Sequence, residues 1–422
     1  MRAFIRDRRA NVAILLGLLA LPLLGLIALA VDLGTAMTIK AQLDLAADAA
    51  ALVAVTDASN LYLAGKPDAI TPAQTDAKAR FAAQAGGRLG VSVGSVSAAV
   101  KQSGTVFTAD VAYTATAPTT LGKLFGALSI PLSGNASSNL SINPYVDIQI
   151  LMDVSSSMTI AATAADIATM QALTAVYKPT GTLPGNVVKG ESCAFACHWT
   201  ATGDDYYALA QRNHVPLRLD MLRAAVKNLI TNIGALNKRG TFRLGLYTFA
   251  QNFTQIYPVS SAIAAAAGAL AAIAPDVNDC SSNCPETYFA AAMAKLASVT
   301  AASGDGGSAA TSQKFLFIVS DGLVDQIVGG SRQIGPISAA DCAAIKAKGV
   351  TILTLYTPYL PLPTNGFYNN NVAPIQSSIG PGLQACASAP SLYFEATNAT
   401  DIDTQLQRML STVLRSSGHL TH

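Results

Sequence analysis

Residues 12–31 form an uninterrupted apolar run, VAILLGLLALPLLGLIALAV, which contains no charged side chain. An α-helix needs about 20 apolar residues to cross the hydrocarbon core of a bilayer. Residues 1–10 hold four arginines and one aspartate, and such an excess of positive charge predicts a cytoplasmic N-terminus. We therefore predict a cytoplasmic tail and a transmembrane helix over residues 1–32, with the rest of the chain outside the cytoplasm.

The same apolar run has a second interpretation, a cleaved signal peptide. Ala28 and Ala30 give a small-x-small pattern that suits signal peptidase. However, the run is longer than the apolar core of a usual signal peptide, about 7 to 15 residues. The residues after it also continue a helical pattern. Both observations favour an uncleaved anchor and a single-pass membrane protein.

Small residues dominate the segment that follows the apolar run. Residues 33 to about 58 predict an Ala-rich helix that continues from the run, and residues 71–86 predict a second helix. From about 90 to 143, small apolar and polar positions alternate around Ser-Gly pairs, which predicts hairpin-like β-structure. We predict that residues 33–144 form an Ala-rich helix and a small β-containing module, of α+β type.

From residue 145 onward, apolar runs of strand length alternate with helical patterns. This order predicts an α/β domain with parallel core strands, and the nearly continuous apolar character of the strands predicts helices on both faces. We predict a doubly wound, mostly parallel sheet over residues 145–416, with a surface insertion at 177–215. The predicted strands are 146–154, 242–250, 315–322, 350–357 and 391–397.

Composition supports this division and removes one class of partner. Of the 422 residues, 51% are hydrophobic and 12% are charged, which is typical of a membrane segment joined to well-packed globular parts. The formal net charge is +2, and no run of Lys or Arg follows the first ten residues. Nucleic acid is therefore not an expected partner.

The cysteines predict disulfides in the exported part of the chain. An even number of cysteines outside the cytoplasm favours disulfides, although the sequence leaves their pairing open. A zinc site with Cys193, Cys197 and His198 is the alternative, but C-x3-C is an unusual spacing for zinc. We expect Cys342 and Cys386 to bracket the last strands. The six disulfide candidates are Cys193, Cys197, Cys280, Cys284, Cys342 and Cys386.

Polar side chains follow two of the apolar strands at the point where each strand ends. Asp153 ends the first strand of this domain, and Ser155 and Ser157 come directly after it. Asp321 ends another apolar strand in the same manner. Ligands of open α/β sheets bind at the carboxyl ends of the strands. Thr287, just before or at the start of a predicted helix, adds a fifth oxygen-bearing side chain.

An all-oxygen set of ligands suits a hard cation rather than zinc or copper. Two carboxylates carry at most the two negative charges that neutralise a dication, and the hydroxyls add none. An open coordination position on the metal can then take a carboxylate of a partner protein. We predict a Mg²⁺ site, with Mn²⁺ or Ca²⁺ as alternatives, whose role is binding. A simpler explanation of the serines is that they cap the next helix. Asp325, four residues beyond Asp321, is expected to be solvated.

The pattern D-x-S-x-S at 153–157, with Thr287 and Asp321 downstream, resembles the metal-ion-dependent adhesion site of von Willebrand factor A domains. The resemblance covers residues 145–416, and it implies a von Willebrand factor A-like fold with these five side chains as metal ligands. The chain departs from the family pattern at CPET, where Glu286 competes with Thr287 as a ligand. The insertion at 177–215 is a second departure.

The N-terminal part is similar to TadE/TadG-like proteins in its Arg-rich tail, its single hydrophobic span ending near VDLG and its Ala-rich AQLDLAADAAALVA. The cysteine-containing segments SCAFACH and CAAIKAKGVTILTLYT fit a TadG-like arrangement with a C-terminal von Willebrand factor A domain. That family implies a component of the Flp (tight adherence) pilus assembly machinery. Such a protein is anchored in the bacterial cell membrane, with its bulk in the periplasm or on the cell surface. Its expected partners are other pilus-assembly or envelope proteins.

Two other functions stay open. A surface adhesin that binds host or matrix proteins through the metal site would differ in its partner alone. A metal-dependent hydrolase is disfavoured, because no G-x-S-x-G elbow follows the strands that carry the aspartates, GxxxxGK[ST] does not occur in the chain, and no histidine lies near those strands. We therefore expect a binding protein and not an enzyme.

Overall fold

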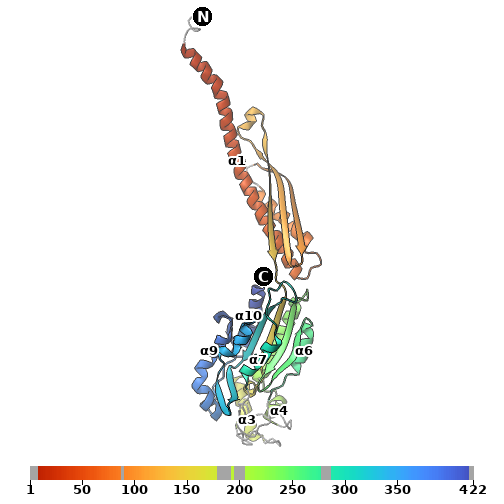
Figure 1. The fold of residues 1–422 in the computed structure, drawn as a ribbon, viewed down its shortest axis with the longest axis vertical. Helices are drawn as coiled ribbons and strands as arrows, with labels where there is room; N and C mark the ends of the chain where they lie inside the picture. Colours follow the sequence, from red (N-terminus) through yellow and green to blue (C-terminus); the bar gives the residue numbers. More distant parts are fainter. Residues whose placement is uncertain (1–7, 87–89, 178–191, 194–204, 277–286, 418–422) are drawn as a thin grey trace. The chain divides into compact units, whose positions relative to one another are not determined.

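The computed structural model describes residues 8–86, 90–177, 192–193, 205–276 and 287–417 (Figure 1). The chain divides into two compact units, Met1–Ile142 and Asn143–His422. One hydrophobic cluster belongs to the first unit and two belong to the second. Each unit therefore has a hydrophobic core of its own.

The first unit is built on one long helix, α1 (Arg8–Leu63). Its described part contains an 18-residue stretch with a mean hydropathy of 2.4, of which 11% is buried, and this stretch is long and apolar enough to cross a membrane. Beyond Asp32 the helix has one buried face, because small and apolar residues recur there at helical spacing. That face includes Ala36, Ile39, Leu43, Ala46, Ala47, Ala50, Ala51, Ala54, Val55 and Ala58.

A second helix and a three-stranded antiparallel sheet pack against this face of α1. Buried and exposed side chains alternate strictly along the central strand, as the alternating sequence pattern predicts. A short 3-10 turn connects the second and third strands. The elements are α2 (Ile70–Ala85), β1 (Ser92–Ser103), β2 (Val106–Pro118), η1 (Gly122–Phe125) and β3 (Ser129–Ser141).

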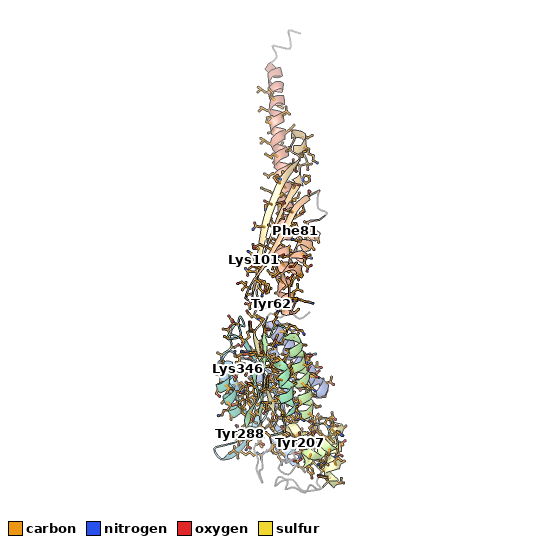
Figure 2. The ribbon with its side chains drawn as sticks, turned by 90° about the vertical axis from the view of Figure 1, so that its right-hand side faces the viewer. Tyr62, Phe81, Lys101, Tyr207, Tyr288 and Lys346 are labelled. Atoms are coloured by element: carbon orange, nitrogen blue, oxygen red, sulfur yellow. A yellow bond between two sulfur atoms is a disulfide. The ribbon has the colours of Figure 1, made fainter. Side chains whose placement is uncertain are left out.

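Aromatic side chains fill the space that the many alanines of the first unit leave. Tyr62 meets Phe107 edge-on, with ring centroids 5.6 Å apart, and Phe81 lies 5.3 Å from Tyr113. Figure 2 labels Tyr62 and Phe81 among the side chains of this unit. The Tyr113 hydroxyl donates a 2.6 Å hydrogen bond to Asp44 on α1, which fixes the sheet against the helix.

The second unit contains a six-stranded sheet in the order β11-β10-β7-β4-β5-β6. All neighbouring strands are parallel except β5 and β6. Counted along the unit, the strand order is 3-2-1-4-5-6, which is an order of doubly wound α/β sheets. The strands are β4 (Val146–Asp153), β5 (Phe242–Phe249), β6 (Phe253–Ser260), β7 (Gln313–Ser320), β10 (Thr351–Tyr356) and β11 (Tyr393–Glu395).

Helices cover both faces of this sheet, because side chains of β4 alternate between two buried clusters. Ile148 and Ile150 belong to the cluster formed with α5 (Arg218–Leu236), α6 (Ile263–Ala271) and α10 (Ala399–Ser416). Leu151 belongs to the other cluster. The helices of that second face are α3 (Ala164–Val176), α4 (Tyr206–Arg212), α7 (Phe289–Val299), α8 (Ala343–Lys346) and α9 (Gln376–Cys386).

The predicted fold class is therefore confirmed: an apolar N-terminal helix and a small α+β module precede a doubly wound, mostly parallel sheet. The five strands predicted from apolar runs are all present. Three further strands were not predicted, namely the edge strand β6 and the hairpin of β8 (Leu323–Val328) and β9 (Ser331–Pro336). Their residues are partly exposed, so they lack the continuous apolar run of a core strand.

Short helical turns complete the unit: η2 (Ser156–Thr159), η3 (Ala339–Cys342), η4 (Tyr368–Val372), η5 (Ala373–Ile375) and η6 (Pro390–Leu392). Of the predicted insertion at 177–215, residues 178–191 and 194–204 lie outside the described part of the chain.

One disulfide joins two late segments of the second unit. Cys342 at the end of η3 is bonded to Cys386 at the end of α9, with their Cα atoms 5.5 Å apart. Cys193 is also disulfide-bonded, which speaks against its predicted alternative role as a zinc ligand. Cys197, Cys280 and Cys284 lie outside the described residues.

Candidate metal centre

The predicted site residues follow the two central strands of the sheet, β4 and β7, which are direct neighbours. In a sheet of this order the connections leave these two strands in opposite directions, which opens a crevice at their carboxyl ends. Asp153 is the last residue of β4, and Asp321 follows the last residue of β7. Both side chains are fully buried. The structure thus brings the two carboxylates to the carboxyl ends of neighbouring central strands.

Asp153 and the two serines form a chain of hydrogen bonds. The backbone N–H and the hydroxyl of Ser155 both donate to Asp153 Oδ1, at 3.0 and 2.6 Å. The hydroxyls of Ser155 and Ser157 are 3.0 Å apart. Ser155 occupies the position before η2, yet its side chain makes no capping hydrogen bond. The helix-capping explanation of Ser155 is therefore wrong, because its hydroxyl is directed to the carboxylate instead.

The two carboxylates differ in how far protein donors satisfy them. Asp153 Oδ2 accepts a hydrogen bond of 2.7 Å from the Ser320 hydroxyl. Asp321 Oδ1 accepts one of 3.1 Å from the backbone N–H of Leu323. Asp321 Oδ2 is buried and has no hydrogen-bond partner. A buried carboxylate oxygen without a donor is costly unless a cation or water is bound to it.

A second buried aspartate on β4 shows what a carboxylate with a purely structural role looks like here. Asp147, near the start of the strand, accepts two hydrogen bonds from Arg243 at 2.6 and 2.7 Å. Lys314 lies 3.5 Å from it on the neighbouring strand. Asp153, at the other end of the same strand, receives hydrogen bonds from hydroxyls and a backbone amide. The end of β4 that carries the predicted site thus has an excess of negative charge that its start does not have.

Burial and charge together raise the pKa of Asp153. Loss of solvent is the largest cause, and the neighbouring carboxylate of Asp321 is the second; the hydrogen bonds from Ser155 and Ser320 act against both. The net effect of these interactions is to raise the pKa of Asp153 from 3.8 to about 7. The buried Tyr359 responds in the same way, since burial and then Asp321 raise its pKa well above the usual value. A dication bound at this point would stabilise the ionised carboxylates.

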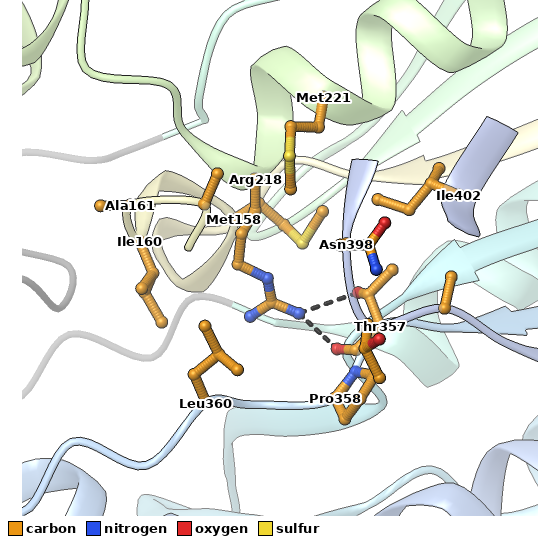
Figure 3. A pocket seen from close by; sticks show the side chains of 13 residues that line it. Met158, Ile160, Ala161, Arg218, Met221, Thr357, Pro358, Leu360, Asn398 and Ile402 are labelled. Atoms are coloured by element: carbon orange, nitrogen blue, oxygen red, sulfur yellow. Dashed lines mark hydrogen bonds between the residues drawn. The ribbon is translucent and has the colours of Figure 1, made fainter. Parts of the chain in front are cut away.

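Arg218 is the functional residue that the sequence analysis missed. It begins α5, is 7% exposed and has Nη1 3.7 Å from Asp321 Oδ2 without making a hydrogen bond to it. Its Nη2 donates instead to the carbonyl and the hydroxyl of Thr357 (Figure 3). The guanidinium also lies over the Tyr359 ring, 5.1 Å from its centroid. A cation in the first turn of a helix opposes the helix dipole, which is a signal that could have marked this arginine.

Thr287 lies at the same end of the sheet through its backbone. It forms an isolated antiparallel bridge with Asp325, with N–H to carbonyl distances of 2.8 and 3.2 Å. The next residue, Tyr288, donates its N–H to the carbonyl of Ala250, directly after β5. Thr287 is 4% exposed. Its predicted competitor, Glu286, lies outside the described residues.

The expectation that Asp325 is solvated is wrong. Asp325 is 6% exposed and forms an ion pair with Arg332 on β9, at 2.5 Å and with a second contact of 2.7 Å. Burial raises the pKa of Asp325 and the arginine acts against it. The hairpin β8–β9 brings these two residues together. Because the hairpin was not predicted from the sequence, the ion pair between Asp325 and Arg332 was not predicted either.

The donor set fits a hard cation better than a soft one. The candidate ligands are carboxylate and hydroxyl oxygens, which suit Mg²⁺, Mn²⁺ or Ca²⁺. Within the described residues, no group of three His, Cys, Asp or Glu side chains could hold a metal. The single histidine among those residues, His214, is exposed in the turn after α4.

Residues 10–62 match the family described as "Putative Flp pilus-assembly TadE/G-like". The predicted resemblance of the N-terminal segment to TadE/TadG-like proteins is thereby confirmed. A comparison with curated proteins finds none that matches the chain.

Several solved structures resemble the chain in part. BatB from Bacteroides thetaiotaomicron is 13% identical with a TM-score of 0.37, over 64% of this chain and 99% of BatB. The vWF domain of the type V pili tip protein Mfa5 from Porphyromonas gingivalis is 11% identical with a TM-score of 0.38, over 67% of this chain and 98% of that domain. Proximal thread matrix protein 1 from the mussel byssus, with a zinc occupied MIDAS motif, is 14% identical with a TM-score of 0.36, over 64% of this chain and 48% of that protein. Likenesses this distant carry no functional argument.

Proposed function

We propose that the chain is a membrane-anchored, extracytoplasmic component of Flp (tight adherence) pilus assembly that binds other envelope proteins through a metal ion. The match of residues 10–62 to a pilus-assembly family supports the cellular role. The apolar stretch of α1 supports the anchor. The observation that carries the metal-dependent part is the buried pair Asp153 and Asp321 at the ends of β4 and β7, one of whose oxygens has no donor.

In this proposal Asp153, Ser155, Ser157, Thr287 and Asp321 hold the metal, with Mg²⁺ as the expected ion. The bound ion supplies a positive charge with an open coordination position, which accepts a carboxylate oxygen of the partner protein. Ser320 and the backbone of Leu323 orient the two aspartates through the hydrogen bonds described above. Arg218 balances part of the negative charge of Asp321 while the metal is absent.

The test is metal titration by calorimetry on the full chain and on two variants. Asp153→Ala is expected to abolish Mg²⁺ and Mn²⁺ binding while the fold persists, because Asp153 is the last residue of β4 and lies at the carboxyl end of the sheet. Asp305→Ala is the matched control, since Asp305 is an exposed aspartate of the same unit whose carboxylate accepts a hydrogen bond from the N–H of Gly307. Equal metal affinity of wild type and Asp153→Ala would remove the proposed site.

The partner is tested by co-purification from detergent-solubilised membranes, with and without Asp153→Ala. Recovery of pilus-assembly proteins with the wild type, and their loss with the variant, supports the assembly role. If the variant loses binding to host or matrix proteins instead, the chain is an adhesin that uses the same site.

A further inference from the structure

The connection between β2 and β3 carries some of the most exposed apolar side chains of the first unit. Leu124 in η1 is 79% exposed, and Leu128 just before β3 is 69% exposed. Both lie in a turn of about ten residues that also presents the exposed Lys123. Two leucines this exposed in one short turn call for a surface that covers them.

The strand β2 leads this turn toward the membrane end of α1. Phe107, at the start of β2, contacts Tyr62 near the C-terminal end of α1. Tyr113, in the middle of β2, donates to Asp44. Later residues of β2 thus contact earlier residues of α1, so β2 runs along α1 toward the apolar span. The turn after β2 is the part of the sheet nearest to that span (Figure 1).

Asp32 fixes the turn at the boundary of that span. Its carboxylate accepts N–H groups from Thr120 at 2.7 Å, from Leu121 at 3.2 and 3.3 Å, and from Gly122 at 2.6 Å. Asp32 is the first charged residue after residues 12–31. Those twenty residues of helix are about 30 Å long, which equals the thickness of the hydrocarbon core. The turn is therefore held at the depth where the outer lipid headgroups begin.

The packing extends even one helical turn further into the span. Ala28 is 3% exposed, whereas its neighbours Ile27 and Leu29 are 50% and 60% exposed. η1 is in contact with α1. A segment packed over Ala28 lies alongside the outer end of the membrane helix.

We propose that the turn 119–128 inserts into the outer membrane–water interface and gives the chain a second contact with the bilayer beside α1. Leu124 and Leu128 enter the acyl-chain region, and the ammonium of Lys123 remains with the lipid phosphates, as long basic side chains do at interfaces. The occupant of this surface is lipid and not a protein, because the turn is fixed to a helix whose adjoining residues are themselves lipid-facing. The inference rests on the proposed membrane anchor and is independent of the metal site.

Tryptophan placed at single positions of the full chain tests the proposal. The only native tryptophan, Trp199, is first replaced by Phe. Leu124→Trp and Leu128→Trp report on the turn, and Leu19→Trp reports on the span. Leu45→Trp is the control, since Leu45 is 67% exposed on α1 but lies about 20 Å beyond Asp32 along the helix. Each variant is reconstituted in two sets of phosphatidylcholine vesicles, whose acyl chains carry bromine near the glycerol end in one set and near the methyl end in the other, because Leu19 lies near the middle of the span and is reached by the deep bromine.

We expect the tryptophans at 124 and 128 to lose about half of their fluorescence to the shallow bromine, and the one at 45 to lose almost none. Using two positions in the turn keeps the test valid if one variant fails to fold. Quenching at 19 without any at 124 and 128 would overturn the inference and leave the anchor intact, and it would assign the leucines to a protein partner. Absence of quenching at 19 as well would overturn the anchor and the inference together.

Discussion

At the scale of single residues, the candidate centre is defined by a charge imbalance. Two buried carboxylates, Asp153 and Asp321, face one guanidinium, Arg218, which stays 3.7 Å from the nearer of them. The guanidinium uses its hydrogen bonds on Thr357 instead. The arginine therefore offsets part of the charge of Asp321 without donating a hydrogen bond to it. The two carboxylates attract a dication, and the nearby guanidinium repels it.

Replacing Arg218 is expected to tighten metal binding. Arg218→Met removes a positive charge beside Asp321, and at the effective dielectric of proteins this favours a dication by about tenfold or more in affinity. Arg218→Lys is the matched control, because it keeps the charge and is expected to bind Mg²⁺ about as wild type does. Calorimetric titration of the three proteins decides. Equal affinities of the Met and Lys variants would contradict the role given to this charge.

Proton binding at Asp153 is expected to compete with the metal. Because the pKa of Asp153 is raised to about 7, the metal must displace a proton below that pH. The apparent affinity for Mg²⁺ should then fall by about tenfold for each pH unit below 7. Titrations between pH 5.5 and pH 8, about the range that brackets this pKa, measure the slope. A pH-independent affinity would argue against Asp153 as a ligand.

The same raised pKa makes a prediction about stability without metal. Between about pH 4 and pH 7 the unfolded chain releases the Asp153 proton while the folded chain keeps it, so that the free energy of unfolding decreases as the pH rises. Asp153→Asn cannot titrate and serves as the reference. As the pH rises across this range, the urea midpoint of the wild type should fall relative to that of Asp153→Asn. A constant difference would speak against a raised pKa.

At the scale of elements, the disulfide between η3 and α9 is expected to stabilise the second unit substantially. Cys342 and Cys386 are 44 residues apart and both are fully buried. Closing a loop of this length contributes about 4 kcal/mol by the chain-entropy estimate. The double variant Cys342→Ala/Cys386→Ala should therefore unfold at a clearly lower denaturant concentration. An unchanged midpoint would show that the bridge stabilises the fold little.

Elements with a strong apolar signal could be predicted from the sequence, and elements that depend on tertiary contacts could not. The core strands β4 and β7 are continuous apolar runs because helices cover both of their faces, and Asp153 and Asp321 stand out at their ends. The strands β8 and β9 are partly exposed and lack a continuous apolar run. The hairpin, and with it the ion pair of Asp325 with Arg332, could therefore not be predicted from the sequence. Arg218 was missed for a similar reason, since its contacts come from Thr357 and Asp321, far away in the sequence.

At the scale of the whole molecule, the two units have separate cores. The cluster of the first unit draws on residues 36–142, and the two clusters of the second unit draw on residues 146–414. All five candidate ligands and the disulfide between Cys342 and Cys386 belong to the second unit. The membrane contacts proposed for α1 and the turn 119–128 belong to the first. Anchoring and metal binding are thus assigned to different parts of the chain.

This separation predicts that residues 143–422, produced alone in an oxidising compartment, fold and bind Mg²⁺ with the affinity of the full chain. A doubly wound sheet with both faces covered by its own helices does not need the first unit to complete its core. Thermal unfolding of the fragment should be cooperative, and Asp153→Ala should remove metal binding from the fragment as it is expected to do in the full chain. A fragment that folds but binds metal more weakly would mean that the first unit contributes to the site. A fragment that does not fold cooperatively would contradict the independence of the two cores, since the first unit would then be needed for the second to fold.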